Sequence, residues 1–352
     1  MADGPVIVGE IASAIGLAEG EAGVRSVVAA LARLEPVSIA KVSRASRLPV
    51  PIVASVCGEL RKRGLVAHER PARLTAAGRD VFGGVELRLP STTCTACDGR
   101  GGSLPRELAP AVRDVARLAR AAPPPRFELD QCHCTVETKL RRVLALHEAD
   151  ALVGRRILVL GDDDLVSLAL ERVVRRLGSA RTIANLTVLD VDPAVVRFVR
   201  ERLARARFPV SCLAHDLREP LPPALVGSFD TVVTDPPYTA LGARLFLSRA
   251  VDTLRPGGSI FLSFGASRRG VFFRVQQELT EMGLAIEALT PDFNRYVGAG
   301  VLGGTSDLVR LRASASVRPL VTGHVAGPLY TADVRRRGAG PTLSRSRRLG
   351  QS

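Results

Sequence analysis

The sequence predicts an α/β protein whose core is a doubly wound, mostly parallel sheet. Short apolar runs that end near glycine or aspartate alternate with amphipathic helical segments from about residue 151 to residue 311. The first run, Ile157 to Leu160, stops at Gly161, and a helical pattern begins a few residues later. Such a run before a crossover helix is typical of a buried parallel strand. The regular alternation therefore favours a sheet with helices on both faces.

Length and composition are those of a globular protein with more than one domain. The chain has 352 residues, of which 46% are apolar. No signal-like segment or apolar run of about twenty residues is present, so we expect a cytoplasmic protein without a membrane partner. The formal net charge of +14 suits a polyanionic partner, but nearly all of the positive charge is arginine, which indicates a compositional bias.

Residues 1–90 are predicted to form a small helical domain. Helical patterns cover Val24 to Leu34, Ile39 to Ser46, Val50 to Arg63 and Ala76 to Phe82, with a small hairpin before the last of them. This order of helix, turn, helix and β-wing resembles a winged-helix domain. Two interpretations stay open: DNA binding, or a module that dimerises or covers the substrate. The second is favoured, because the candidate recognition helix is only modestly basic.

A connector, residues 91–150, contains two pairs of cysteines. Four thiolates can hold one Zn²⁺ tetrahedrally, with His133 as a substitute ligand. The candidate zinc ligands are Cys94, Cys97, Cys132 and Cys134. In the alternative interpretation, the first pair shapes a tight turn and the second is incidental. The connector ends in a predicted helix, Val136 to Glu148, with Thr135 as its cap.

The Rossmann-like catalytic domain is predicted over residues 151–314. After the first strand, further strands are expected at Asn185 to Val191, Val210 to Leu213, Phe229 to Thr234, Ser259 to Phe264, Leu284 to Leu289 and Leu308 to Leu311. Helices are expected at Leu165 to Leu177, Pro193 to Ala206, Ala240 to Leu254 and Val271 to Met282. Residues 315–352 are predicted to be a basic, disordered tail, because their arginine clusters show no apolar period.

Acidic residues follow four consecutive predicted strands. They are Asp162 to Asp164, Asp190 with Asp192, Asp216, and Asp235. The carboxyl ends of parallel strands share one edge, so these carboxylates are expected to converge on one crevice. Asp190 is placed to accept hydrogen bonds from ribose hydroxyls, whereas Asp192 is expected to cap the next helix. Asp216 would lie beside an adenine amino group.

The first loop, Gly161-Asp162-Asp163-Asp164, indicates a cationic ligand. The layout resembles class I adenosylmethionine-dependent transferases, whose methyltransferase members usually have a glycine-rich loop at this position. Three carboxylates would repel the carboxylate of adenosylmethionine. They would favour decarboxylated adenosylmethionine, whose sulfonium and terminal ammonium are both cationic. The three aspartates and Gly161 are therefore candidate donor contacts.

The fourth strand is followed by Asp235-Pro236-Pro237-Tyr238. The two prolines fix the backbone, which aims the carboxylate of Asp235 and a proline carbonyl at an incoming amine. Tyr238 can pack over that amine or over a planar base. Taken alone, the motif is similar to that of amino-methylating enzymes that act on adenine N6 or cytosine N4.

Together, the acidic loop and this motif resemble the branched-chain polyamine synthases, the N4-bis(aminopropyl)spermidine synthases. The resemblance covers about residues 6–312. It also includes Thr92-Thr93-Cys94, Cys97, Gly99-Arg100-Gly101, Asp216-Leu217, Phe293-Asn294, Tyr296 and Thr305-Ser306-Asp307-Leu308. The resemblance implies aminopropyl transfer from decarboxylated adenosylmethionine to a secondary amine of spermidine, with release of methylthioadenosine. It also implies a homodimer.

Within this interpretation we expect Asp235 to act as base or amine-orienting group and Tyr238 to position the nitrogen. Asp162 and Asp164 are expected to bind the ammonium charges, and Asp130 or Glu137 to add charge from the connector. Pro236 and Pro237 join the donor contacts. The alternatives are an adenosylmethionine-dependent amino-methyltransferase acting on nucleic acid, or a DNA-binding sensor without turnover.

Overall fold

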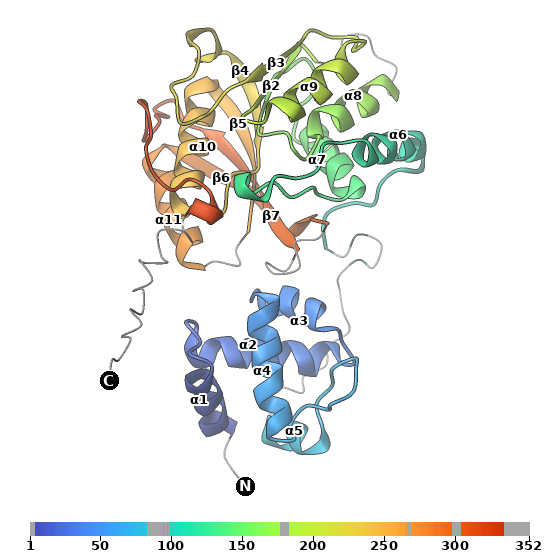
Figure 1. The fold of residues 1–352 in the computed structure, drawn as a ribbon, viewed down its shortest axis with the longest axis vertical. Helices are drawn as coiled ribbons and strands as arrows, with labels where there is room; N and C mark the ends of the chain where they lie inside the picture. The colour runs from blue at the N-terminus through green and yellow to red at the C-terminus, as the bar shows by residue number, and fades with distance from the viewer. Residues whose placement is uncertain are drawn as a thin grey trace, which may run out of the picture.

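The computed structural model describes residues 4–82, 94, 97, 99–176, 183–265, 269–297 and 304–333. Its larger part is a sheet enclosed by two layers of helices, with the N-terminal helices at one end of the molecule (Figure 1). The strands are β1 Arg156–Leu160, β2 Asn185–Asp190, β3 Val210–Ala214, β4 Phe229–Thr234, β5 Leu254–Phe264, β6 Leu284–Arg295 and β7 Thr305–Ala313. The prediction of an α/β fold with a mostly parallel sheet is confirmed.

The strand order is β3-β2-β1-β4-β5-β7-β6. Strands β1 to β5 run parallel, and β7 is antiparallel to both of its neighbours. The chain order reverses between β1 and β4, which lie side by side. In open α/β sheets a crevice for ligands forms at the carboxyl ends of the strands at such a reversal. The loops after β1 and β4 therefore face each other across it.

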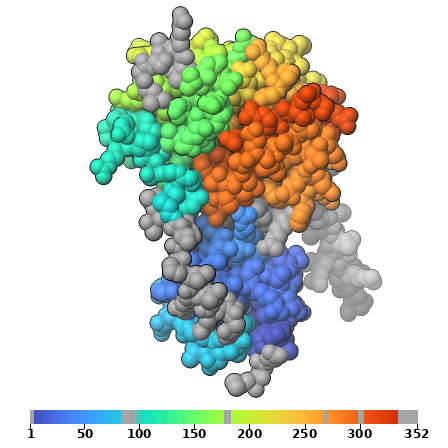
Figure 2. All heavy atoms as spheres, turned by 180° about the vertical axis from the view of Figure 1, so that it is seen from behind, coloured from blue at the N-terminus to red at the C-terminus, as the bar shows by residue number. Residues whose placement is uncertain are grey.

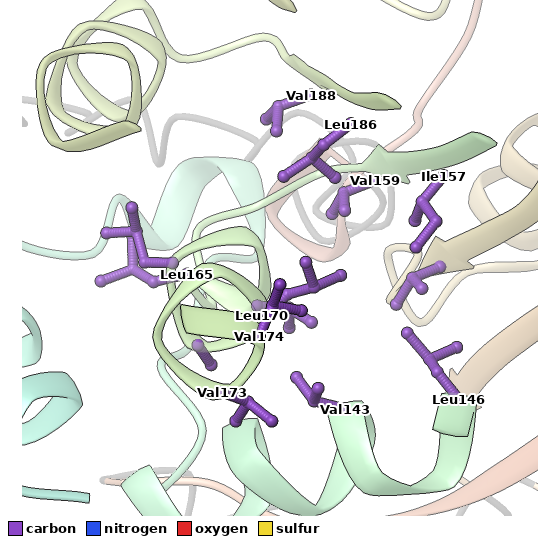
Figure 3. Close-up of a cluster of buried hydrophobic side chains, with 14 of the residues drawn as sticks. Val143, Leu146, Ile157, Val159, Leu165, Leu170, Val173, Val174, Leu186 and Val188 are labelled. Atoms are coloured by element: carbon purple, nitrogen blue, oxygen red, sulfur yellow. The ribbon is translucent and has the colours of Figure 1, made fainter. Parts of the chain in front are cut away.

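Helices cover both faces of the sheet. The main ones are α6 Ala109–Arg120, α7 Val136–Glu148, α8 Val166–Arg176, α9 Pro193–Leu203, α10 Ala240–Thr253 and α11 Arg269–Glu281. Strand β1 alternates between two apolar clusters: Ile157 and Val159 pack with α7 and α8, and Leu158 and Leu160 pack on the other face with α10. Figure 3 shows the first of these clusters. Burial on both faces explains why β1 is apolar at consecutive positions.

Five helices lie near the N-terminus of the described chain: α1 Gly4–Ala14, α2 Gly20–Leu34, α3 Ile39–Ser46, α4 Val50–Lys62 and α5 Ala76–Val81. They enclose their own apolar core. Between α4 and α5, Val66 pairs with Leu74 in a single antiparallel bridge. This end of the molecule lies below the part that carries β6 and β7 (Figure 2), and Arg47 Nη1 is 3.6 Å from the Asp307 carboxylate of β7.

The prediction of a disordered tail from residue 315 is wrong for residues 315–333. Leu329 is 1% exposed and packs against the second apolar cluster. The buried guanidinium of Arg249 donates to the carbonyl oxygens of Thr322 and Gly323, at 3.0 and 2.7 Å. The arginine clusters at 335–337 and 345–348 lie outside the described residues. None of the described helices combines the length and apolar character needed to cross a bilayer.

Candidate active site

Two adjoining cavities open at the carboxyl ends of the parallel strands. The first is lined by residues that include Gly161, Leu189, Asp190, His215, Asp216, Pro237, Phe246, Leu329 and Tyr330. The second is lined by residues that include Cys132, Asp164, Pro236, Tyr238, Tyr296, Thr305 and Thr331. Three carboxylates, Asp130, Asp163 and Asp235, line both cavities. The predicted convergence of strand-end carboxylates on one crevice is therefore observed, except for Asp162 and Asp192, which line neither cavity.

Asp162 points away from both cavities. Its side chain is 0% exposed and accepts hydrogen bonds from the backbone N–H of Ser167, at 3.2 Å, and from the Ser167 hydroxyl. It thus holds the first turn of α8. Burial raises the pKa of Asp162 to about 7. The expected contact between Asp162 and a ligand ammonium has no support in this geometry, because adjacent loop side chains diverge and this one turns inward.

Asp163 lies at the junction of the two cavities, where Asp162 had been expected to meet a ligand ammonium. The backbone N–H of Cys132 donates to its Oδ2 at 3.1 Å. Burial, reinforced by the negative charges of Asp164, Asp190 and Asp235, raises the pKa of Asp163 well above its usual range. Once this carboxyl has ionised beside a bound cation, its raised pKa makes it a good acceptor for a proton from an amine.

Asp164 lines the second cavity but is already paired with cations. Its Oδ2 is 2.7 Å from Arg142 Nη1, and its Oδ1 is 3.7 Å from Lys139 Nζ. Burial disfavours the charged form, but Arg142 and then Lys139 outweigh it and lower the pKa of Asp164. Both cations come from α7, at positions i and i+3 on the face turned toward the loop after β1.

The segment Cys132-His133-Cys134 clasps the acidic loop. Besides the bond from Cys132, His133 Nδ1 lies 2.7 Å from the carbonyl oxygen of Asp163, and the backbone N–H of Cys134 donates to Asp164 Oδ1. The segment therefore fixes the direction of two of the three carboxylates. This is a structural use for a motif that the sequence left unexplained.

The predicted zinc site is not formed among the described residues. No group of three or more His, Cys, Asp or Glu side chains in this part of the chain is arranged to hold a metal ion. Cys94 is exposed, whereas Cys134 is buried with its Sγ 3.7 Å from Lys139 Nζ. Burial raises the pKa of the thiols of Cys132, to about 11, and of Cys134.

The first cavity contains the carboxylates expected to bind a nucleoside. Asp190 accepts hydrogen bonds from the backbone N–H groups of Asp162 and Asp192, at 2.8 and 2.7 Å, which fix its side chain. Asp192 caps α9 through the N–H of Ala194, as predicted. Asp216 lies beside His215 on the cavity wall. The ribose and adenine roles of Asp190 and Asp216 remain predictions.

Asp235 directly follows β4, and two side chains from other elements hold it. Its Oδ2 accepts hydrogen bonds from Arg142 Nη2 at 2.8 Å and from the Tyr296 hydroxyl at 2.5 Å. Burial raises the pKa of Asp235 to about 6, although Arg142 opposes that shift. Tyr238 stacks on Phe264 with ring centroids 5.2 Å apart, and its hydroxyl lies 3.4 Å from that of Tyr296.

The sequence interpretation missed Arg142, Lys139 and Tyr330. The first two form a basic pair one helical turn apart, on a helix that shortly precedes three aspartates, and this pairing was the available signal. No sequence signal pointed to Tyr330, because it follows the sheet in a segment without periodicity. Of the two connector acids, Asp130 lines the cavities, whereas Glu137 pairs with Arg100 and Arg141.

A protein-family model described as the branched-chain polyamine synthase A C-terminal domain matches residues 111–317. The chain belongs to the branched-chain polyamine synthase family. It is 32% identical over 265 residues to the N(4)-bis(aminopropyl)spermidine synthase of Thermococcus kodakarensis, which covers 72% of each protein. It is 33% identical over 266 residues to the enzyme of that name from Thermus thermophilus, covering 74% of this chain and 73% of the relative.

A solved structure of this family has the same architecture. The branched-chain polyamine synthase from Thermus thermophilus, in complex with N4-aminopropylspermidine and 5'-methylthioadenosine, superposes with a TM-score of 0.74 at 27% identity. The match covers 94% of this chain and 97% of that one. The likeness therefore extends over both the N-terminal helices and the α/β part of this family member.

Proposed function

We propose that this protein is an aminopropyltransferase that moves an aminopropyl group from decarboxylated adenosylmethionine to a secondary amine of spermidine. The observation that carries the proposal is the pair of adjoining cavities with Asp130, Asp163 and Asp235 in common. Two substrates bound side by side would meet at these three carboxylates. The names of the relatives, and the product pair bound in the Thermus thermophilus structure, support the same reaction.

In the reaction, a neutral secondary amine attacks the aminopropyl carbon that is bonded to the sulfonium sulfur. A carbon–nitrogen bond forms as the carbon–sulfur bond breaks, and sulfur keeps the electron pair to become the thioether of methylthioadenosine. The positive charge passes from sulfur to nitrogen, and a neutral amine product forms when a base removes one proton. The site must therefore bind cations and hold a proton acceptor beside the nitrogen.

The first cavity is assigned to the nucleoside of the donor and the second to the polyamine. Asp190 and Asp216 suit the ribose and the adenine, and the apolar walls of Phe246 and Leu329 suit the base. The second cavity has Tyr238 and Tyr296 beside the carboxylates, which suits a chain of methylene groups between amines. The donor sulfur would then lie where the cavities join.

Asp235 is assigned to orient the attacking nitrogen, and Asp163 to accept its proton. Asp235 is held by Arg142 and Tyr296 on one oxygen, so its direction is fixed. Within the described residues no ion pair engages Asp163, and burial beside other acids raises its pKa, which suits a proton acceptor. Of the two roles expected for Asp235, this geometry favours orientation. Tyr238 supports the hydroxyl of Tyr296.

The same carboxylates select the decarboxylated donor. A carboxylate on the donor would sit among Asp130, Asp163 and Asp235 in a crevice of low dielectric constant. Like charges at such distances repel by several kcal/mol, about 4 kcal/mol for two charges 4 Å apart at an effective dielectric constant near 20. An aminopropyl ammonium at the same place would be attracted instead. The preference is therefore a property of charge rather than of size.

The proposal is tested by incubating purified protein and spermidine with decarboxylated or ordinary adenosylmethionine. We expect methylthioadenosine, and a spermidine derivative enlarged by one or two aminopropyl groups, only with the decarboxylated donor. Chromatography with mass detection measures both products. Turnover only with ordinary adenosylmethionine and DNA or RNA would establish the amino-methyltransferase instead. DNA binding without turnover of either donor would establish a sensor.

The N-terminal helices are proposed to form a winged-helix domain, residues 1–90, that contributes to a homodimer. The succession of α3, α4 and the bridged Val66 and Leu74 supports the first part. Residues 91–150 remain the proposed connector and 151–314 the catalytic domain. Light scattering tests the dimer, and fluorescence anisotropy with duplex DNA tests whether nucleic acid is a partner. We also propose that the protein is cytoplasmic.

A further inference from the structure

One buried cation joins the elements that build the crevice. Arg142 comes from α7, outside the sheet, and its side chain is 3% exposed. It donates from Nη1 to Asp164 after β1, from Nη2 to Asp235 after β4, and from Nε to Asn294 of β6, at 2.7, 2.8 and 2.7 Å. A single planar guanidinium thus fixes three elements with its fork of donors.

We propose that Arg142 is the positioning residue that holds Asp235 charged and directed at the acceptor nitrogen. This inference rests on the proposed aminopropyl transfer and deepens it. Without the guanidinium, Asp235 would lie in a buried site among other acids and would tend to take a proton. A protonated Asp235 no longer attracts the ammonium groups of a polyamine, nor accepts a hydrogen bond from the attacking nitrogen through a charged oxygen.

The backbone that carries Arg142 is rigidly placed. The next residue, Val143, and Leu146 point into the apolar cluster against β1 and α8 (Figure 3). The Thr135 side chain caps α7 by accepting a bond from the N–H of Thr138, and the Thr138 hydroxyl in turn accepts one from the N–H of Arg295. The helix therefore presents Arg142 from a fixed support, as a positioning role requires.

The charges around Asp235 show why a cation matters there. The titratable groups that face it are Arg142 from α7, Asp163 and Asp164 after β1, Tyr238 after β4, Tyr296 at the end of β6, and Asp130 and Cys132 before α7. Burial and Asp164 raise the pKa of Asp235, and Arg142 is the largest influence that lowers it. The net result, a pKa of about 6, leaves the carboxyl ionised at neutral pH.

Arg142 also removes Asp164 as a competitor for the polyamine. Asp164 is held by Arg142 and Lys139, so its charge is already matched before any substrate binds. The helix α7 thereby pairs Asp164 with two cations, whereas Asp235 shares the guanidinium of Arg142 with Asp164 and keeps more of its negative charge for the substrate. Asp163 accepts a hydrogen bond from the backbone N–H of Cys132 and makes no ion pair within the described part of the chain, so its carboxyl can pair with the substrate.

The test compares Arg142→Gln and Arg142→Lys with a matched control, Arg141→Gln. Arg141 is the next residue of α7 and is also buried, but it bonds to Glu137 and the Gly102 carbonyl and lines neither cavity. The rate of methylthioadenosine formation is measured from pH 5 to 9 for each variant. In parallel, the Asp235 carboxyl is titrated by carbon-13 NMR of labelled aspartate, with Asp235→Asn to assign its signal.

In Arg142→Gln we expect the titration of Asp235 to move up by about one pH unit or more, because a neighbouring cation typically lowers a carboxyl pKa by that much. Because burial raises the pKa of Asp235 to about 6, we expect the wild-type rate to fall as pH drops through about 6, and the variant to lose activity at a correspondingly higher pH. At neutral pH, kcat should fall about 100-fold. Arg142→Lys keeps the charge, so its titration should stay near wild type while kcat falls about tenfold, because a single ammonium nitrogen cannot reproduce the fork of three nitrogens that donate to Asp164, Asp235 and Asn294.

Arg141→Gln should leave the midpoints of both the titration and the rate profile where they are. An unchanged Asp235 titration in folded Arg142→Gln would overturn the inference. If that variant does not fold, Arg142→Lys decides, and wild-type kcat in it would overturn the bridging role. If the wild-type protein forms no methylthioadenosine, the proposed function is refuted. The titration of Asp235 would still test whether Arg142 keeps that carboxyl charged.

Discussion

The loops after β1 and β4 both bring aspartates to the crevice, but they do so in opposite ways. The β1 loop has three consecutive aspartates, and their side chains go to three environments: the start of α8, the junction of the cavities, and a buried pair of cations. The β4 loop has one aspartate followed by two prolines, and Arg142 and Tyr296 fix it from two other elements. The β1 loop thus sends its three carboxylates in different directions, whereas the β4 loop holds one carboxylate in a fixed direction.

Three consecutive aspartates therefore do not share one function, because each side chain lies in a different environment. The pKa values of two of these adjacent carboxyls shift in opposite directions, since burial raises that of Asp163 and cations lower that of Asp164. After β4, in contrast, the side chains of Arg142 and Tyr296 both bind the single carboxylate of Asp235. Substitutions in the two loops should therefore lower kcat by different factors, and the contacts of each carboxylate predict the order.

The largest effect is expected for Asp235→Asn. The amide cannot supply the negative charge that orients the amine, and it leaves Arg142 with one fewer carboxylate. We expect kcat for methylthioadenosine formation to fall about 1000-fold, as for loss of a preorganised electrostatic group. Isothermal calorimetry should show that methylthioadenosine still binds, because the nucleoside contacts are elsewhere. Activity within tenfold of wild type would remove Asp235 from its assigned role.

Asp163→Asn should come next. Loss of a general base typically costs at least about 100-fold, and we expect kcat to fall by about that factor. The deficit should shrink as pH rises, because more of the amine is then neutral before it binds. A stopped assay from pH 7 to 10 measures this recovery. A deficit that stays constant with pH would assign Asp163 to binding the donor charge rather than to proton transfer.

Tyr296→Phe removes one of the two bonds to Asp235 but leaves Arg142. A hydrogen bond to a charged group contributes about 1.5 kcal/mol or more, so kcat should fall about tenfold. The Tyr238 ring, which stacks on Phe264, should stay in place. Tyr238→Phe is the matched control, since the Tyr238 hydroxyl lies 3.4 Å from the Tyr296 hydroxyl, which itself donates to Asp235. A larger loss in the control would reverse the assigned order of the two tyrosines.

The smallest effect is expected for Asp162→Asn, directly beside Asp163. An amide can accept from the Ser167 N–H and donate to its hydroxyl, so kcat should stay within about threefold of wild type. The effect on stability depends on pH. Since burial raises the folded-state pKa of Asp162 to about 7, its favourable contribution is present below about pH 4 and is lost as pH rises through 7.

The variant has no such titration. Its melting temperature relative to wild type should therefore increase between pH 5 and pH 8, as scanning calorimetry can measure. A large loss of activity in Asp162→Asn, with an intact melting transition, would show that Asp162 reaches the substrate after all. That outcome would erase the contrast with Asp163.

Much of the fold could be predicted from the sequence, because periodicity and strand-end residues are local signals. The parallel strands, the cap of α7 by Thr135 and the cap of α9 by Asp192 are found where they were predicted. The helix Gly4–Ala14 and the packing of residues 315–333 were not predicted. The latter segment has no periodicity of its own, and distant partners such as Arg249 hold it in place.

The gathering of carboxylates at one edge of a parallel sheet could be predicted from the sequence, since strand direction places them there whatever the details of packing. Which carboxylate lines a cavity could not be predicted, because that depends on partners remote in the chain. Cys132 reaches Asp163 across 31 positions, and Arg142 reaches Asp235 across 93. Hydrogen bonds and burial of that range leave no local pattern, yet they set both the direction and the charge of each group.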